Sequence, residues 1–227
     1  MTAAADSNAL TAKQLRCYRS HRPLFDALSF ELEPGSGLYI GGPNGSGKTT
    51  LLRALVGLSD NYDGQVQWGG VDTRRCSWQF RNSLLYLGHL PACNTQLTPL
   101  ENLEWWSALH AQQLFAHSRE AGLQRCAAAL RELGLSAYLD TPCYRLSAGQ
   151  LRRVALARLT LSQHPLWVLD EPFTAIDSDG VLRLQQQMSA HLAAGNTLVV
   201  TSHQPLSIDG LQQLTLKPCA ADEVLLQ

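Results

Sequence analysis

The chain has 227 residues, a formal net charge of −1, 45% hydrophobic residues and 16% charged residues. This composition is typical of a globular domain with a sizeable core and excludes a disordered chain. It also argues against a nucleic-acid partner, which would require a clustered basic excess. No apolar run reaches the roughly 18–20 residues that cross a bilayer, and Met1 to Leu10 lacks the features of a signal peptide. Any membrane role is therefore expected to come through a partner.

The hydrophobic periodicity predicts strands that alternate with helices. Residues 1–12 are predicted to be disordered, and residues 13–227 to form one domain. In chain order, the predicted strands cover residues 24–32, 37–40, 65–68, 84–87, 166–169 and 197–201. The predicted helices cover residues 49–58, 100–110, 121–133, 151–161 and 181–194. This alternation favours an α/β core with a mostly parallel sheet, into which a helical subdomain at about 97–145 is inserted.

A glycine-rich segment lies between a predicted strand and a predicted helix. Its sequence, Gly42-Pro43-Asn44-Gly45-Ser46-Gly47-Lys48-Thr49, matches G-x-x-x-x-G-K-[S/T], and Thr50 follows it. Glycines allow the backbone N–H groups to point inward at phosphate oxygens, and the helix that follows presents its positive end. Lys48 is expected to reach the β- and γ-phosphates, and the Thr49 hydroxyl to bind Mg²⁺. The segment therefore predicts ATP binding.

Two acidic residues end the apolar strand at 166–169. Asp170 and Glu171 follow it, and Pro172 ends the strand. Open α/β sheets bind ligands at the carboxyl ends of their strands, so both acids are expected near the phosphates. Asp170 is predicted to hold Mg²⁺, and Glu171 to act as general base toward water. Without the glycine-rich loop, the same pair would fit a solvated turn equally well.

The segment Leu146-Ser147-Ala148-Gly149-Gln150 resembles the LSGGQ signature of the ABC-type ATPases, with Ala148 in place of a glycine. The resemblance implies an ABC-type nucleotide-binding domain of the P-loop NTPase class, which carries an antiparallel β subdomain. It also implies that these residues act in trans, on the nucleotide held by a second copy. Small residues and a helix start suit close approach to a γ-phosphate.

Other landmarks of that family follow in order. Asp177 resembles the end of the D-loop, which lines the dimer seam, and His203 resembles the switch histidine that contacts the γ-phosphate. His89 replaces the usual Q-loop glutamine, where imidazole nitrogen is a weak candidate for the metal contact. Tyr18 is a weak candidate for stacking on adenine, and a packed or surface tyrosine is an equal alternative.

Four segments resemble one subfamily, the ATP-binding subunit of the haem exporter in cytochrome c maturation. They are Gly88-His89-Leu90-Pro91, Leu146-Ser147-Ala148-Gly149-Gln150, Leu169 to Asp177, and Thr201-Ser202-His203-Gln204-Pro205. The resemblance implies a peripheral ATPase on the cytoplasmic face of a bacterial inner membrane, paired with integral membrane permease subunits. Its ATP hydrolysis would drive release of a haem-loaded chaperone. The alternative is an ABC exporter for another small molecule or a lipid.

The expected working unit is a sandwich dimer, in which each ATP lies between the glycine-rich loop of one copy and the signature of the other. Trp105 and Trp106 are candidates for anchoring a permease helix, with a core role as the alternative. ABC ATPases of DNA repair need long coiled coils or zinc modules, and translation factors usually carry two ATPase units. The sequence has neither feature, and Glu171 disfavours a binding module without hydrolysis.

Overall fold

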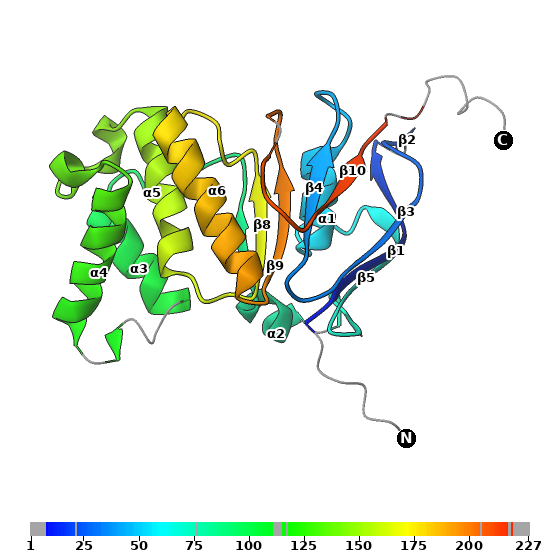
Figure 1. Cartoon of the computed structure of the whole chain (residues 1–227), viewed down its shortest axis with the longest axis horizontal. Coiled ribbons are helices and arrows are strands. Elements are labelled where there is room, and N and C mark those ends of the chain that lie inside the picture. The colour runs from blue at the N-terminus through cyan, green and yellow to red at the C-terminus, as the bar shows by residue number, and fades with distance from the viewer. Residues whose placement is uncertain are drawn as a thin grey trace. The chain divides into compact units, whose positions relative to one another are not determined.

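The computed structural model describes residues 8–20, 22–75, 77–110, 115–116, 118–204, 206–217 and 219. These residues belong to two compact units (Figure 1). The first unit comprises residues 1–86, 165–171 and 188–227, and the second comprises residues 87–164 and 172–187. Among the described residues, no helix combines the length and the apolar character that a bilayer crossing requires.

The first unit contains a five-stranded sheet with the order β10-β4-β9-β8-β7. Its strands are β4 (Gly37–Gly41), β7 (Leu84–Leu87), β8 (Leu166–Asp170), β9 (Thr197–Thr201) and β10 (Leu211–Thr215). The pairs β10–β4, β4–β9 and β9–β8 are parallel. Every residue of β8 and β9 is buried, as expected of central strands in a parallel sheet. The carboxyl ends of β4, β8 and β9 therefore meet at one edge.

A second, antiparallel sheet completes the first unit. It contains β1 (Leu10–Arg19), β2 (Arg22–Pro23), β3 (Leu28–Leu32), β5 (Tyr62–Trp68) and β6 (Val71–Asp72). Strand β1 pairs with β2, β3 and β5. The helices α1 (Lys48–Leu55) and α2 (Ser77–Asn82) belong to the same unit. Side chains from β1, β4, β5, α1, β8 and β9 form one hydrophobic core, and its burial stabilises the loop that opens α1.

The second unit is helical. It contains α3 (Pro99–His110), α4 (Arg119–Glu132), the short helices η2 (Ser136–Tyr138) and η3 (Cys143–Arg145), and α5 (Ala148–Leu161). Helix α6 (Ser178–Ala193) begins in this unit. The two tryptophans of α3 divide: Trp106 is buried against His110 and His164, whereas Trp105 is 64% exposed. Only Trp105 is therefore placed to meet a partner.

The predicted fold class is confirmed, and the predicted disordered start is corrected in part. Residues 1–7 lie outside the described residues, but Leu10 to Ala12 begin β1 and pair with β3 and β5. Buried Leu10 and Ala12 alternate as in a strand, and a register shift at Lys13–Arg16 then breaks the alternation. The sequence pattern therefore hid β1. The helical unit also extends beyond the predicted insert at 97–145.

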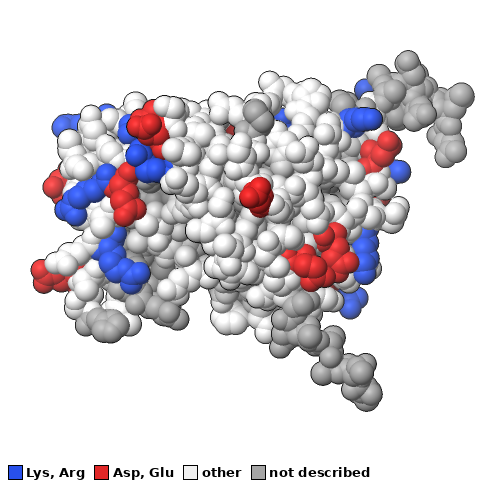
Figure 2. All heavy atoms as spheres, viewed as in Figure 1, with Lys and Arg blue, Asp and Glu red and all other residues white. Residues whose placement is uncertain are grey.

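Charged residues are sparse on the face of the molecule drawn in Figure 2. Lys and Arg occur there in small groups beside Asp and Glu, and most of the visible surface carries neither kind. This face therefore presents no broad basic region of the kind that binds nucleic acid.

Candidate functional site

The loop between β4 and α1 depends on glycine conformations. Gly42 has φ 138° and Gly47 has φ 99°, both in the region that L side chains rarely adopt. A Cβ at Gly42 would lie 2.8 Å from the carbonyl oxygen of Leu216, and one at Gly47 would lie 3.0 Å from the Phe25 ring. Gly47 is also the N-cap of α1, so the loop leads into the positive end of a helix. This backbone has the shape of an anion cradle.

Two buried polar side chains lie in the cradle. Lys48 is 7% exposed, and its Nζ donates to the carbonyl oxygens of Gly42 at 2.8 Å and Pro43 at 3.4 Å. Ser46 is buried, and its hydroxyl has no hydrogen-bond partner within the described ranges. A phosphate oxygen would satisfy both groups. The other predicted loop residues lie at the exposed tip or in the first turn of α1: Asn44, Gly45, Thr49 and Thr50.

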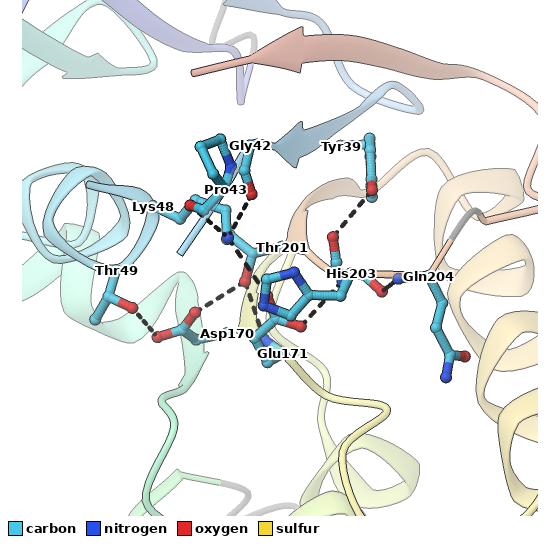
Figure 3. A network of polar contacts seen from close by, with 11 residues as sticks. Tyr39, Gly42, Pro43, Lys48, Thr49, Asp170, Glu171, Thr201, His203 and Gln204 are labelled. Atoms are coloured by element: carbon cyan, nitrogen blue, oxygen red, sulfur yellow. Dashed lines mark hydrogen bonds and ion pairs between the residues drawn. The ribbon is translucent and has the colours of Figure 1, made fainter. Parts of the chain in front are cut away.

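Asp170 ends β8 and receives two hydroxyl hydrogen bonds. Thr49 Oγ1 donates to its Oδ2 at 2.9 Å, and Thr201 Oγ1 donates to its Oδ1 at 2.8 Å (Figure 3). Asp170 is buried, at 1% exposure. A buried carboxylate beside a threonine hydroxyl supplies the hard oxygen ligands that Mg²⁺ prefers. The residues present therefore fit the predicted metal.

Glu171 follows in a left-handed conformation, with φ 49°. Its N–H donates to Thr201 Oγ1 at 2.9 Å. Its Oε2 accepts from the N–H of His203 at 3.2 Å, and its Oε1 lies 3.3 Å from His203 Nε2. Lys48 Nζ lies 4.0 Å from the same Oε1. The turn thus directs the Glu171 side chain to the lysine of the cradle and to the predicted switch histidine.

His203 is presented by a short segment after β9. Tyr39, on β4, donates its hydroxyl to the carbonyl oxygen of Ser202 at 2.9 Å. The N–H of Gln204 donates to Ser202 Oγ at 2.9 Å. These bonds fix the residues on either side of His203, whose own side chain is about half exposed, at 54%. The imidazole is therefore open to a ligand while its backbone is held.

In the second unit, Ser147 is the N-cap of α5. Its Oγ accepts from the N–H of Gln150 at 3.2 Å, and Gln150 Oε1 accepts from the N–H of Ser147 at 2.8 Å. This reciprocal pair is a capping box. Ala148 opens the helix, and a Cβ added to Gly149 would lie 3.0 Å from the carbonyl oxygen of Ala175. The glycine at 149 thus allows the segment before α6 to approach α5 closely.

Asp177 caps the next helix. Its Oδ1 accepts from the N–H of Gly180 at 2.9 Å, at the start of α6. Ala175, two residues earlier, has φ 61°. The predicted seam residue therefore has a structural task in its own chain as well.

The structure shows other contacts at His89 and Tyr18, and the metal contact predicted for His89 and the adenine contact predicted for Tyr18 stay predictions. His89 is exposed and belongs to the second unit, where Arg152 Nη1 donates to the carbonyl oxygens of Gly88 at 2.6 Å and of His89 at 3.5 Å. Tyr18 Oη donates to Asp63 Oδ2 at 2.5 Å, and this hydrogen bond raises the pKa of Tyr18. The bond ties the tyrosine to β5, and the adenine contact stays a prediction.

Sequence reasoning missed two residues of this network, Thr201 and Tyr39. Both lie at or near the carboxyl ends of predicted apolar strands, and neither is predicted to be a site residue, although Thr201 also begins a segment that resembles the subfamily. The sequence did contain a signal for both. Each residue carries a hydroxyl group in a mostly apolar strand, Thr201 close to the predicted histidine and Tyr39 close to the glycine-rich loop. Such a group needs a polar partner when it is buried.

Comparison with known proteins places this arrangement in a class. The family model described as ABC transporter matches residues 25–174. The chain belongs to the ABC transporter family and is one of its ATPase subunits.

Within this family, the chain is similar to proteins named cytochrome c biogenesis ATP-binding export protein CcmA. It is 44% identical to the one from Saccharophagus degradans, covering 90% of this chain and 91% of that protein. It is 45% identical to the one from Escherichia coli strain K12, covering 88% of this chain and 91% of that protein. A relative from Salmonella paratyphi A is 46% identical, covering 91% and 96%.

Solved structures agree with this fold. One is the ATP-binding cassette MJ0796, described as a dimer in a post-hydrolysis state with ADP and phosphate. Its TM-score is 0.75 at 24% identity, covering 86% of this chain and 88% of that one. An ATP-binding subunit of an ABC transporter has a TM-score of 0.73 at 22% identity, covering 86% and 79%. At these identities the likeness concerns the fold.

Proposed function

We propose that this chain is the ATPase subunit of an export complex in cytochrome c biogenesis, and that two copies bind and hydrolyse MgATP between them. The network that joins Lys48, Asp170, Glu171 and His203 carries the proposal. It gathers a cation, two carboxylates and an imidazole beside an anion cradle. The relatives named above favour cytochrome c biogenesis over another exported cargo.

ATP binding uses the backbone of Gly42–Thr49 and the ammonium of Lys48. In the structure, Lys48 Nζ bonds to neutral carbonyl oxygens of its own loop. With a phosphate oxygen the acceptor is charged as well as the donor, so triphosphate is the better partner for the ammonium. The Ser46 hydroxyl and the N-terminus of α1 supply further donors.

Thr49 and Asp170 would hold Mg²⁺, since their oxygens lie 2.9 Å apart and are of the type that this ion binds. When bound, the ion neutralises charge on the β- and γ-phosphates. The charge balance of the network agrees with this assignment. Asp170 and Glu171 bring two negative charges and Lys48 brings one positive charge, so an added cation is favoured when the anionic substrate enters.

Hydrolysis uses Glu171 as the proton acceptor for the attacking water. Its carboxylate is held beside His203, whose imidazole would contact the terminal phosphate in this proposal. The fixed main chain on both sides of the pair keeps these groups in place without reorganisation. His203 then orients the base and senses whether a γ-phosphate is present.

The second copy supplies the start of α5. Ser147 Oγ accepts a bond from its own helix, and the described residues show no bond donated by its hydroxyl hydrogen. That hydrogen and the α5 N-terminus are free to meet a γ-phosphate of the partner. ATP therefore closes the dimer, and hydrolysis reopens it. Asp177 contributes to the seam between the copies.

The closing and reopening of the dimer moves membrane permease subunits, to which the chain binds at the cytoplasmic face of a bacterial inner membrane. The family resemblance suggests this location, and the relatives' names, which describe export proteins, support the link to transport. Trp105, 64% exposed on α3, is a candidate contact for a permease helix. The complex thereby couples ATP turnover to the release of a haem-loaded chaperone.

The substitution Glu171→Gln tests the catalytic half of the proposal. We expect phosphate release to fall by about 10²- to 10⁴-fold, because the amide cannot accept the proton. ATP binding should persist, and ATP should trap a dimer visible by size-exclusion chromatography with light scattering. Glu33→Gln, at an exposed residue before β4, is the matched control and should behave as wild type. Undiminished hydrolysis in Glu171→Gln would refute the assigned base.

Testing the proposed role in cytochrome c biogenesis requires identification of the proteins that bind this chain. Purification of the chain from its native membrane, followed by mass spectrometry, should recover permease subunits of cytochrome c biogenesis together with it. Recovery with an unrelated exporter would overturn the cargo and leave the ATPase assignment intact.

A further inference from the structure

Thr201 is the last residue of β9 and is completely buried, at 0% exposure. Its hydroxyl makes two hydrogen bonds at once. It donates to Asp170 Oδ1 at 2.8 Å and accepts from the N–H of Glu171 at 2.9 Å (Figure 3). One hydroxyl group therefore joins the side chain of the first acid to the backbone of the second.

The backbone of Glu171 needs such support. A residue with a Cβ rarely adopts φ 49°, because the left-handed conformation crowds the side chain against the carbonyl oxygen. Conformations of this kind persist where the surroundings hold them, and they are common at functional sites. The bond from Glu171 N–H to Thr201 Oγ1 is such a restraint. It acts at the turn that directs the Glu171 carboxylate toward His203 and Lys48.

The side chain of Asp170 is oriented by the same group. With Oδ1 bonded to Thr201, Oδ2 accepts from Thr49. The rotation of this carboxylate is thereby fixed, with one oxygen directed to the threonine of the cradle. Thr201 also precedes His203 by two residues, so one strand end anchors the groups assigned to metal binding, proton transfer and phosphate sensing.

We propose that Thr201 is a positioning residue of the ATPase site, whose hydroxyl sets Asp170 for magnesium and Glu171 for water activation. This inference rests on the function proposed above, because it assumes the roles given there to the two acids. Thr201 itself touches neither the nucleotide nor the reacting atoms in this assignment. It acts only through the two residues that it holds.

The same strand provides a matched control. Thr197 opens β9, is 1% exposed, and its hydroxyl has no hydrogen-bond partner among the residues that the structure describes. Valine has nearly the shape of threonine and lacks only the hydroxyl. Thr197→Val therefore makes the same chemical change in the same buried strand without removing a bond.

The test compares the full-length chain with Thr201→Val, Thr201→Ser and Thr197→Val. For each protein, ATP affinity is measured by titration with and without Mg²⁺, and the kcat and KM of phosphate release are determined. We expect Thr201→Val to bind metal-free ATP within about twofold of wild type, since the cradle is intact. Its gain in affinity on adding Mg²⁺ should shrink by about fivefold, kcat should fall by about 10- to 100-fold, and the KM for MgATP should rise by about the same factor as the lost gain in affinity.

Thr201→Ser keeps the hydroxyl and should retain most of the Mg²⁺-dependent gain in affinity and most of kcat. Thr197→Val should match wild type in ATP affinity, in the response to Mg²⁺ and in kcat. The inference is overturned if Thr201→Val and Thr197→Val have the same kcat and the same response to Mg²⁺. It is also overturned if Thr201→Val loses metal-free ATP binding or fails to fold, because the hydroxyl would then serve the fold in general. A wild-type chain that hydrolyses no ATP would instead defeat the proposed function itself.

Discussion

The two units of the chain prepare their functional groups in different ways. In the first unit, functional side chains bond mainly to one another and to the cradle, as Lys48, Asp170, Glu171 and Thr201 do. In the second unit, the polar groups of the signature serve their own helix, through the capping box of Ser147 and Gln150. One region is a network of mutually bonded polar groups, proposed above as the reaction site, and the other is a capped helix start.

This difference explains why each unit needs a counterpart. The first unit has the proposed base, the proposed metal ligands and the cradle, in which Lys48 Nζ donates to a carbonyl oxygen and the Ser46 hydroxyl has no hydrogen-bond partner among the described residues. The second unit offers the N-terminus of α5. Under the proposed function, ATP supplies the anion, and a second copy supplies the helix start. The division of labour implies that nucleotide binding and dimer closure can be impaired separately.

Among changes in the first unit, removal of the Lys48 ammonium should give the largest loss of ATP affinity. Lys48→Ala deletes the ammonium that would bond to phosphate, and it leaves Glu171 without that neighbouring charge. We expect ATP affinity to fall by about 100-fold, since bonds between charged groups contribute about 1.5–3 kcal/mol each. Equilibrium titration with a fluorescent ATP analogue measures this loss.

The exposed Lys217 provides the control for that experiment. Lys217→Ala removes the same charge from the chain and should leave affinity unchanged. If wild type, Lys48→Ala and Lys217→Ala bound ATP with equal affinity, the assignment of the cradle as the phosphate site would be wrong. The proposed difference between the two units would then be lost as well.

An intermediate effect is expected where α5 packs closely against the segment before α6. A Cβ at Gly149 would lie 3.0 Å from the Ala175 carbonyl oxygen, so Gly149→Ala must push the segment before Asp177 away from α5. Overpacking of this kind costs about 1–3 kcal/mol. We expect ATP-dependent dimerisation to weaken about tenfold, while ATP binding to the isolated chain changes less than twofold.

Analytical ultracentrifugation with and without ATP separates these two quantities. Ala148→Gly, at the neighbouring position, relieves space instead of filling it and should dimerise nearly as wild type. If Gly149→Ala weakened ATP binding to the single chain and left dimerisation intact, the assignment of this segment to the partner's nucleotide would be wrong.

The sequence was sufficient for the parts of the fold that depend on local pattern. The predicted strand at 84–87 agrees with β7, and the apolar runs near 166 and 197 agree with β8 and β9. Strand β1 was missed because a register shift interrupts its alternation. Strand β10 was missed because it lies at a sheet edge, pairs only with β4, and buries little of its side chains. Edge strands and irregular strands carry weak periodic signals.

The same limit applies to the site. Motif spacing predicted Lys48, Asp170 and Glu171, because the chemistry of phosphate and metal binding restricts residue type. It could not predict that Thr201 joins the two acids, since that contact depends on the register between β8 and β9. It also gave no sign that Gly149 faces Ala175 within one chain. Pairings of residues distant in sequence require the three-dimensional arrangement.

The smallest effect should separate a helix cap from a binding residue. Ser147 caps α5, and Ser118 caps α4 by accepting from the N–H of Ala121 at 3.0 Å. Replacing either serine by alanine should lower the free energy of unfolding by about 1 kcal/mol, as measured by urea denaturation, because each change removes one N-cap bond. Stability alone therefore does not distinguish the two helix starts.

ATP-dependent dimerisation should distinguish them. Ser147→Ala also removes the hydroxyl proposed to meet the γ-phosphate bound by the partner. The ATP-dependent dimerisation constant should therefore fall severalfold, which corresponds to about 1 kcal/mol. Ser118→Ala, with the same loss of stability, should dimerise as wild type. If the two variants dimerised equally well, Ser147 would be a cap and nothing more. The helix start would then act on the partner's nucleotide only through its backbone N–H groups and its dipole.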